Sequence, residues 1–464
     1  GNCPELDPLS DSSIGDLLRL PTSAAVSQTI NIILFIHITT SKSYSPHTRS
    51  FLSQFSHLDE RTIAATLKNP ESALKEAEQL VEQTKDEHAF KGKTFRMVGM
   101  GLGAIAGGVL VGVTGGLAAP LVGAGVTALF GALGVGGTAV GLLASGLASS
   151  SVVCGALFGA YGAQSTAGMV RRYTREIRDL AVLPVRRPEE TLAVRLCVSG
   201  WLTDRGDVTA PWTVFEGDDT YALQWEVEAL EELSSALYTL VKTSAMRYVK
   251  AELIKRTFLA SLMSSLAPIA WLNIGRIIAL KAGSVLATLL SSHAFGTRPI
   301  TLTGYSLGAL VIFEALTQLA ALPPSRTTHL IHDVFLFGAP VPADGRTWSA
   351  VRRLVAGRLI NGYAASDYVL AVLARATDAS WNVAGLQVVD VQGVENVCCD
   401  DAGVDGHLKW RGMIGRCLEI CRAPGVNHEE VERQTREVRD TENTPELTSE
   451  EIGEATKPGL NEIR

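Results

Sequence analysis

Residues 304–308 read GYSLG, and this spacing of two glycines around a serine suits nucleophilic catalysis. The preceding PITLTGYS predicts a strand, and residues 307–321 predict a helix directly after the serine. A sharp turn between a strand and a helix lifts the serine hydroxyl above the sheet, and the glycines keep the crowded backbones apart. We therefore interpret Ser306 as a candidate nucleophile; the alternative is an incidental serine in a tight turn.

A serine hydroxyl needs a base to become a good nucleophile. In a sheet with this kind of turn, an acid and then a histidine follow the serine along the chain, each in a loop after a later strand. His407, in VDGHLKW, follows the last predicted strand and is the expected general base. His428 lies in a polar segment, and His329 and His332 come before a strand, at the wrong end of the sheet.

The acid should follow a strand between the serine and the histidine. Asp367 follows the strand RLINGYA and fits this position, whereas Asp390 lies inside the predicted strand LQVVDVQG. Three further aspartates are too close to His407 in sequence to come from a separate loop: Asp400, Asp401 and Asp405. Asp367 is therefore the expected partner of His407.

An oxyanion formed at the serine needs two amide donors. One should be the backbone N–H of Leu307, directly after the nucleophile. The other should come from the loop VSGWLTD, through Trp201 or Leu202. This chemistry predicts no cofactor and no metal.

The surrounding pattern from about residue 191 alternates short apolar runs with helical periods. Strands are expected at 192–200, PITLTGYS, 333–340, RLINGYA and LQVVDVQG, and helices at 307–321, 348–356, 368–376 and 408–421. Residues 221–290 are expected to be helical, with a loop near Pro268. Near-continuous apolar strands alternating with helices predict an α/β fold with a parallel-rich, doubly wound sheet covered on both faces.

The remaining chain divides by composition. From Met97 to Val170 there is no charged residue, and glycines recur four apart, as in closely packed membrane helices. The alternative is a buried helical hairpin in a soluble protein. The expected organisation is a mostly helical region at 1–96, a glycine-rich transmembrane hairpin at 97–170, a basic linker at 171–190, the α/β domain that carries the candidate serine at 191–423, and a polar, disordered tail at 424–464.

Bulk composition narrows the class of protein. The net charge of −7 argues against a nucleic-acid-binding surface. The seven cysteines are an odd number without C-x-x-C spacing, which favours a reducing compartment over a disulfide framework. Basic residues flank the apolar segment on both sides, which favours a cytosolic location for both ends and hence an even number of spans. The expected arrangement is two spans in an intracellular membrane, with the catalytic domain in the cytosol.

Several segments together resemble one family. LCVSGWLTD, YALQWEVEAL, RPITLTGYSLGALVIFEAL, VFLFGAPVP, LINGYAASDYVLAVLAR and DGHLKWRG are similar to the DUF726 family, the transmembrane and coiled-coil domain-containing protein 4-like members of the α/β-hydrolase superfamily. The resemblance covers about residues 71–421. It implies an α/β-hydrolase fold with Ser306, Asp367 and His407 as the triad, and it implies no substrate.

These observations predict a membrane-anchored serine hydrolase that acts on carboxylic esters, with membrane lipids or lipid-like esters as substrates. The alternative is a membrane scaffold or trafficking protein on a weak or inactive hydrolase fold. The insertion LASLMSSLAPIAWLNIGRIIAL is expected either to form a lid or interfacial helix or to pack on the sheet as an ordinary helix.

Overall fold

The computed structural model describes residues 22–69, 150–158, 179–243, 266–371 and 382–443. The chain forms two compact units, one of residues 1–42 and 50–153, the other of residues 43–49 and 154–464. In the first unit, α1 (Ser23–Ser41) and α3 (Glu60–Lys68) are joined through the Asn31 side chain, which accepts the Asp59 N–H at 2.8 Å. The described part of the expected helical region, residues 22–69, is mostly helical.

The second unit is built on a seven-stranded sheet in the order β1-β3-β2-β4-β5-β6-β7. Only β1 runs antiparallel to its neighbour. Every residue of β2, β3 and β4 is buried, as expected for parallel strands covered on both faces. The expected α/β class is confirmed. The strands are β1 (Ala181–Pro184), β2 (Val194–Val198), β3 (Asp219–Gln224), β4 (Ile300–Tyr305), β5 (Ile331–Phe337), β6 (Leu359–Tyr363) and β7 (Val394–Cys398).

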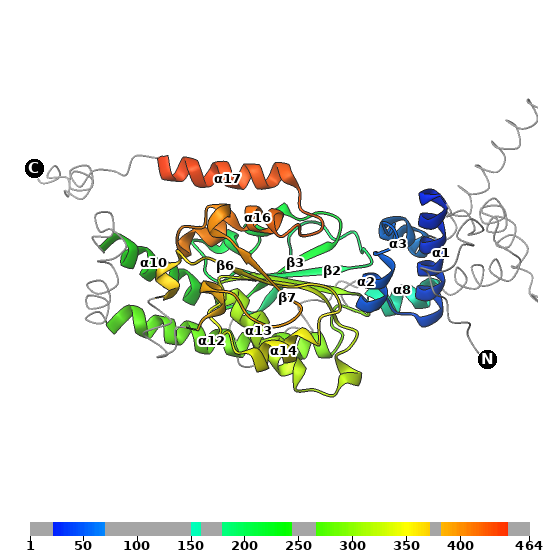
Figure 1. Cartoon of the computed structure of the whole chain (residues 1–464), viewed down its shortest axis with the longest axis horizontal. Coiled ribbons are helices and arrows are strands. Elements are labelled where there is room, and N and C mark those ends of the chain that lie inside the picture. The colour runs from blue at the N-terminus through cyan, green and yellow to red at the C-terminus, as the bar shows by residue number, and fades with distance from the viewer. Residues whose placement is uncertain (1–21, 70–149, 159–178, 244–265, 372–381, 444–464) are drawn as a thin grey trace, which may run out of the picture. The chain divides into compact units, whose positions relative to one another are not determined.

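Helices cover both faces of the sheet (Figure 1): α16 lies on one side, and α12, α13 and α14 lie on the other. The central helix α13 is almost entirely buried, because it packs between the sheet and α12. The helices of this unit are α10 (Val227–Thr243), α12 (Leu266–Ser291), α13 (Leu307–Ala320), α14 (Gly345–Arg352), α16 (Trp410–Ile420) and α17 (His428–Asn443). The residues of α2 (Pro46–Leu52) and of α8 (Ser150–Phe158) are each divided between the two units. Short 3₁₀ turns lie at Arg205–Val208, Ala210–Val214, Pro324–Arg326, Ala384–Leu386, Asp400–Ala402 and His407–Lys409.

The edges of the sheet differ from expectation. The stretch at 219–224 is strand β3 rather than the start of a helix, and β1 lies inside the expected linker. LQVVDVQG is not a strand; the edge strand is β7, which begins at the next residue. The Asn396 side chain of β7 exchanges two hydrogen bonds with the Val389 backbone, of 2.7 and 3.0 Å, so this apolar stretch lies against the edge without joining the sheet.

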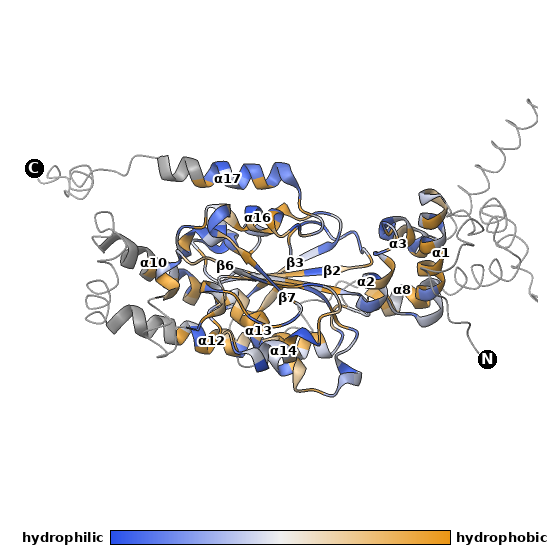
Figure 2. Ribbon diagram, viewed as in Figure 1, coloured by the Kyte–Doolittle hydropathy of each residue, from blue (hydrophilic) through white to orange (hydrophobic). Residues whose placement is uncertain are grey.

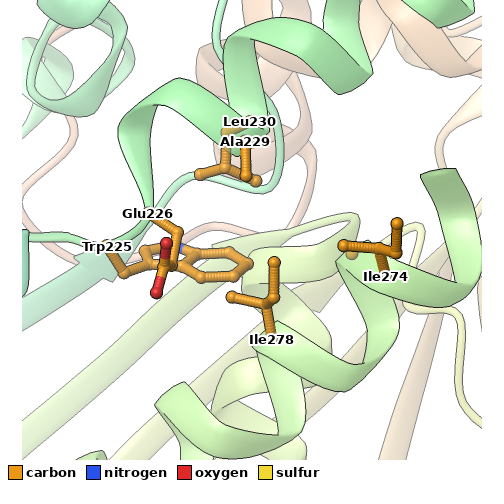
Figure 3. A pocket seen from close by; sticks show the side chains of 7 residues that line it. Trp225, Glu226, Ala229, Leu230, Ile274 and Ile278 are labelled. Atoms are coloured by element: carbon orange, nitrogen blue, oxygen red, sulfur yellow. The ribbon is translucent and has the colours of Figure 1, made fainter. Parts of the chain in front are cut away.

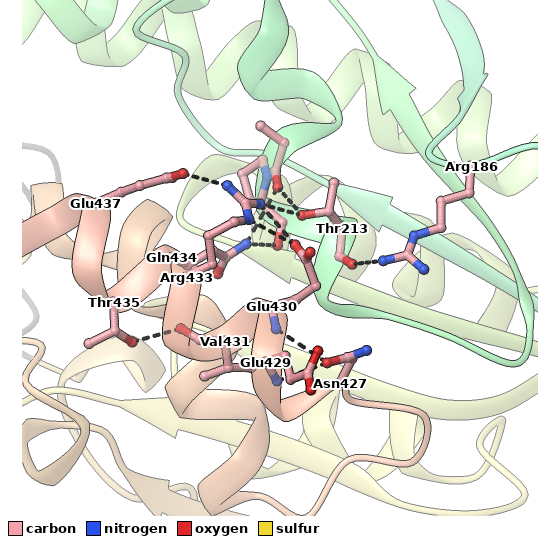
Figure 4. Close-up of polar contacts among 12 residues, drawn as sticks. Arg186, Thr213, Asn427, Glu429, Glu430, Val431, Arg433, Gln434, Thr435 and Glu437 are labelled. Atoms are coloured by element: carbon pink, nitrogen blue, oxygen red, sulfur yellow. Dashed lines mark hydrogen bonds and ion pairs between the residues drawn. The ribbon is translucent and has the colours of Figure 1, made fainter.

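The helical expectations also change in two places. Pro268 lies in the first turn of α12 rather than in a loop, a position where proline's missing N–H costs little. Residues 428–443, expected to be disordered, form α17, which is hydrophilic over most of its length (Figure 2). Polar contacts hold it in place (Figure 4): Gln434 donates to the Pro211 carbonyl at 2.9 Å, and Arg433 donates to the Thr213 hydroxyl at 3.2 Å.

Two of the described helices, α1 and Ile274–Ser291 within α12, are long and apolar enough to cross a membrane by length and composition. In α12, buried Ala279, Ala282 and Leu286 explain the apolarity, since this helix packs along α13. Most of the expected transmembrane segment, and the first part of the expected lid segment, lie outside the described residues. The described part of the expected transmembrane segment is α8. There the Ala156 carbonyl accepts from the Thr297 N–H at 3.3 Å, so this part of α8 contacts the segment before β4.

Candidate active site

Ser306 occupies the turn between β4 and α13 in a strained backbone conformation. Its φ of 53° and ψ of −127° are unusual for a residue with a side chain. The turn is held by the Ser306 N–H, which donates to the Phe337 carbonyl at 2.9 Å, and by the Ser306 carbonyl, which accepts from the Leu310 N–H at 3.2 Å. This is the strand–turn–helix setting that the GYSLG spacing predicts.

The two glycines of the turn permit close backbone approach. A Cβ at Gly304 would lie 3.0 Å from the backbone of Gly308, within the turn itself. A Cβ at Gly308 would instead overlap the carbonyl oxygen of Val198, at the end of the neighbouring strand β2. The second glycine therefore serves packing of α13 against β2, which the sequence pattern does not reveal.

Three side chains meet at the carboxyl end of the sheet. The Ser306 Oγ lies 2.7 Å from Nε2 of His407, and Nδ1 of His407 lies 2.8 Å from Oδ2 of Asp367. The three residues follow β4, β7 and β6, respectively, and all are buried, with exposed fractions of 4%, 4% and 0%. Because a carboxylate only accepts hydrogen bonds, this contact assigns the proton to Nδ1 and leaves Nε2 to accept from the serine hydroxyl.

The Asp367 carboxylate has further donors. Trp410 donates its Nε1–H to Oδ2 at 2.9 Å, and the Leu370 backbone N–H donates to Oδ1 at 2.9 Å. The buried Trp410 lies three residues after His407, at the start of α16, and its residue type alone does not indicate a role in the site. Its only sequence signal is its place in DGHLKWRG.

Asp400, set aside as a catalytic acid, supports the loop that carries Asp367. Its carboxylate accepts the N–H groups of Ala365 and Ser366, at 3.0 and 3.2 Å, and the Ser366 hydroxyl. Partial burial works to raise the pKa of Asp400, but the Ser366 hydrogen bond, with smaller contributions from Cys398 and the backbone donors, holds that pKa below its ordinary value. Asp390 is exposed and takes no part in the site.

The other histidines considered from the sequence lie elsewhere. Nδ1 of His428, on α17, lies 2.6 Å from Glu419. His329 contacts the Ser45 hydroxyl at 3.2 Å, and His332 pairs with Asp333 at 3.2 Å. Of the four histidines weighed from the sequence, only His407 reaches Ser306.

The loop after β2 borders the serine. A Cβ at Gly200 would lie 2.6 Å from the Leu307 nitrogen and 2.7 Å from the Ser306 Cβ, so this loop runs directly beside the turn. The next residue, Trp201, is buried, and its carbonyl accepts from the Tyr305 hydroxyl at 3.2 Å. No acceptor for the backbone N–H of Leu307 or Trp201 lies among the described residues.

Asp207 organises this loop. Its Oδ2 accepts the Thr203 N–H at 2.7 Å, and its carbonyl accepts from the Ser199 hydroxyl at 3.0 Å. Its Oδ1 pairs with Arg411 of α16, four residues after His407. Burial works to lower the pKa of Arg411, but the hydrogen bond and charge of Asp207 outweigh it and raise that pKa. One ion pair thus joins the loop after β2 to the helix that follows His407.

The strand order, the strained serine turn and the order of the three side chains along the chain define the α/β-hydrolase class. Within it, the chain belongs to the family described as "Protein of unknown function (DUF726)", whose model matches residues 92–423.

Three curated relatives carry names of a membrane protein, a transmembrane protein and a probable lipase. The chain is 36% identical to an uncharacterized membrane protein of Schizosaccharomyces pombe, covering 81% of this chain and 68% of the relative. It is 35% identical to a transmembrane and coiled-coil domain-containing protein of Oryza sativa, covering 75% and 55%. It is 33% identical to "Probable lipase MIL1" of Saccharomyces cerevisiae, covering 64% and 28%. No solved structure matches.

Proposed function

We propose that this protein is a membrane-anchored serine hydrolase that cleaves carboxylic esters of lipids or lipid-like molecules. The single observation that carries the proposal is the continuous contact from Ser306 through His407 to Asp367. Serine, histidine and carboxylate in this order supply a nucleophile, a base and an orienting group.

The reaction follows from the geometry. Ser306 Oγ attacks the ester carbonyl while its proton moves to Nε2 of His407. The protonated His407 then gives that proton to the departing alcohol, which leaves the acyl group on Ser306. Water then attacks the acyl carbon while its proton moves to His407, the bond from that carbon to Ser306 Oγ breaks, and His407 returns the proton to Oγ as the acid leaves. Asp367 orients the imidazole and stabilises its charged form throughout.

The developing oxyanion needs donors beside Ser306. We assign the backbone N–H groups of Leu307 and Trp201, because Gly200 places the loop after β2 against the Leu307 nitrogen. A larger residue at position 200 would occupy this space. The close approach of the two backbones supports the assignment.

The lipid assignment rests on location and relatives. A catalytic domain joined to an apolar, charge-free segment meets esters that partition into the bilayer. One relative, of whose length this chain covers 28%, is named a probable lipase, and other relatives are named membrane or transmembrane proteins. This chain would accordingly act on long-chain esters.

A fluorophosphonate probe tests the chemistry, since it reacts only with an activated serine. We expect the full chain to be labelled, Ser306→Ala to lose the label, and Ser292→Ala, at an exposed serine, to keep it. Hydrolysis of a panel of lipid esters then identifies the substrate. An unlabelled but folded chain would instead favour a membrane scaffold on an inactive hydrolase fold.

A further inference from the structure

A small apolar pocket opens between α10 and α12, beside the end of β3 (Figure 3). Ala229 and Leu230 of α10 face Ile274, Gly275 and Ile278 of α12, with the Trp225 ring along one wall. The pocket is a shallow hollow rather than a closed cavity, because its empty volume of about 230 Å³ includes open solvent at the mouth. Glu226 is the only charged residue that lines it.

Two contacts connect this pocket to the nucleophile turn. A Cβ at Gly275 would lie 3.0 Å from Leu307 Cδ1, so the side chain directly after Ser306 packs against the pocket wall. On the other side, Trp225 donates its Nε1–H to the Ser199 carbonyl at 3.2 Å, and the next residue, Gly200, borders Ser306. The Leu307 side chain therefore links the pocket wall to the turn that carries Ser306.

The strand order decides which part of an ester would face this pocket. Ser306 follows β4, while His407 and Asp367 follow β7 and β6, on one side of β4. Trp225 follows β3, on the opposite side. His407 must reach the departing alcohol, so the alcohol lies on the β6–β7 side and the acyl group points towards the pocket.

We propose that the α10–α12 pocket binds the aliphatic acyl chain of the ester, an inference that rests on the proposed hydrolase function. Its apolar lining matches a hydrocarbon chain, whose burial is favourable for each methylene. Ile274 of α12 lines the pocket and is 44% exposed, so its apolar side chain extends from the pocket to the outside of the helix. An acyl chain leaving a bilayer would meet apolar side chains along this path.

Filling the pocket should change the chain-length preference. Ile278→Phe adds bulk inside the pocket, whereas Ile277→Phe makes the same change one residue away on an exposed surface. For detergent-solubilised full chain, the measurement is the ratio of kcat/KM for p-nitrophenyl octanoate to that for p-nitrophenyl acetate. We expect Ile278→Phe to lower the ratio at least about tenfold, equivalent to losing roughly two buried methylenes, and Ile277→Phe to preserve it.

A binding measurement separates this inference from the proposed function. Dodecanoate should displace a fluorescent fatty acid from Ser306→Ala protein, and adding Ile278→Phe should weaken that displacement at least about tenfold. An unchanged octanoate-to-acetate ratio, or an equal effect of Ile277→Phe, would overturn the pocket assignment while hydrolysis and labelling of Ser306 persist. A wild-type chain that neither labels nor hydrolyses acetate would overturn the hydrolase function itself, and the acyl-chain role with it.

Discussion

Ser306 combines a strained backbone with a side chain directed at His407, and these two properties can be separated by mutation. Glycine adopts a positive φ without the steric cost that serine bears, a cost of about 1–3 kcal/mol. Ser306→Gly should therefore lose probe labelling and still unfold at a higher temperature. Ser306→Ala should lose labelling without this gain, because alanine keeps the strained Cβ. Thermal unfolding of both variants in detergent checks this, and equal unfolding temperatures would mean that the turn stores no strain.

Asp367 is expected to support catalysis by holding His407 in the tautomer that has its proton on Nδ1. An asparagine at this position can donate its amide N–H to Nδ1, which moves the ring proton to Nε2 and removes the acceptor for Ser306. Asp367→Asn should reduce kcat by about 10⁴. Asp390→Asn, at an exposed carboxylate outside the site, is the matched control and should behave as wild type. Steady-state hydrolysis measures both, and greater sensitivity at Asp390 would rule out Asp367 as the acid.

At the scale of elements, Asp207 and Arg411 join the loop after β2 to α16. Asp207 is 1% exposed, so removing its charge leaves Arg411 without its partner. A double-mutant cycle of Asp207→Asn and Arg411→Gln should give a coupling of about 1–2 kcal/mol in unfolding free energy. Arg416→Gln, also on α16, removes solvent-accessible ion pairs with Glu419 and with Glu432 of α17 and should cost less than about 0.5 kcal/mol. Purely additive effects of the first two variants would show that the pair does not connect these elements.

The stability of the loop between β6 and Asp367 should decrease in acid, because Asp400 becomes protonated. The folded-state pKa of Asp400 lies below its ordinary value, so its contribution to stability is present above that value and is lost as the pH falls through the folded pKa. Asp400→Asn should lower kcat at pH 7 and flatten the fall in stability below about pH 4. Asp401→Asn, an exposed neighbour, is the control and should keep the wild-type pH dependence. If stability depends on pH in the same way in the wild type and both variants, Asp400 does not stabilise this loop.

The sequence predicts the central elements well because burial on both faces leaves continuous apolar runs, as in β4, β5 and α13. It fails at β3, where alanine, leucine and glutamine in DTYALQ favour a helix. It also fails at β7, whose VENVC carries polar residues because it lies at the sheet edge. The serine, acid and histidine were suggested by their order along the chain. Trp410, Asp400 and Asp207 were not, since their contacts depend on how distant segments pack.

At the scale of the whole molecule, α12 and the charge-free segment at 97–170 are both apolar, but for different reasons. The apolarity of α12 is accounted for by packing on α13, so this helix is not needed as a span. The Ala156 carbonyl, near the end of the charge-free segment, accepts from the Thr297 N–H, so we expect any crossings to end before α8. Residues 97–149 remain available, enough for two helices at about 20 residues per span.

Charge on the two sides of this segment sets the expected topology. Lysine and arginine near span ends favour the cytosolic side. Such residues lie on both sides of the segment: Lys91, Lys93 and Arg96 before it, Arg171, Arg172 and Arg175 after it. With both sides cytosolic, the number of crossings is even, so we expect a two-span hairpin with the N-terminal region and the α/β unit facing the cytosol.

Protease protection of sealed vesicles whose cytosolic face is outside, with a tag at each end of the chain, tests this arrangement. Digestion of both tags is the expected result, with a lumenal marker protein protected as the control for sealing. Protection of one tag alone would require an odd number of crossings and would place the N-terminal region and Ser306 on opposite sides of the membrane. Protection of both tags would keep the hairpin but reverse its orientation, and the catalytic unit would then act on lipids of the lumenal leaflet.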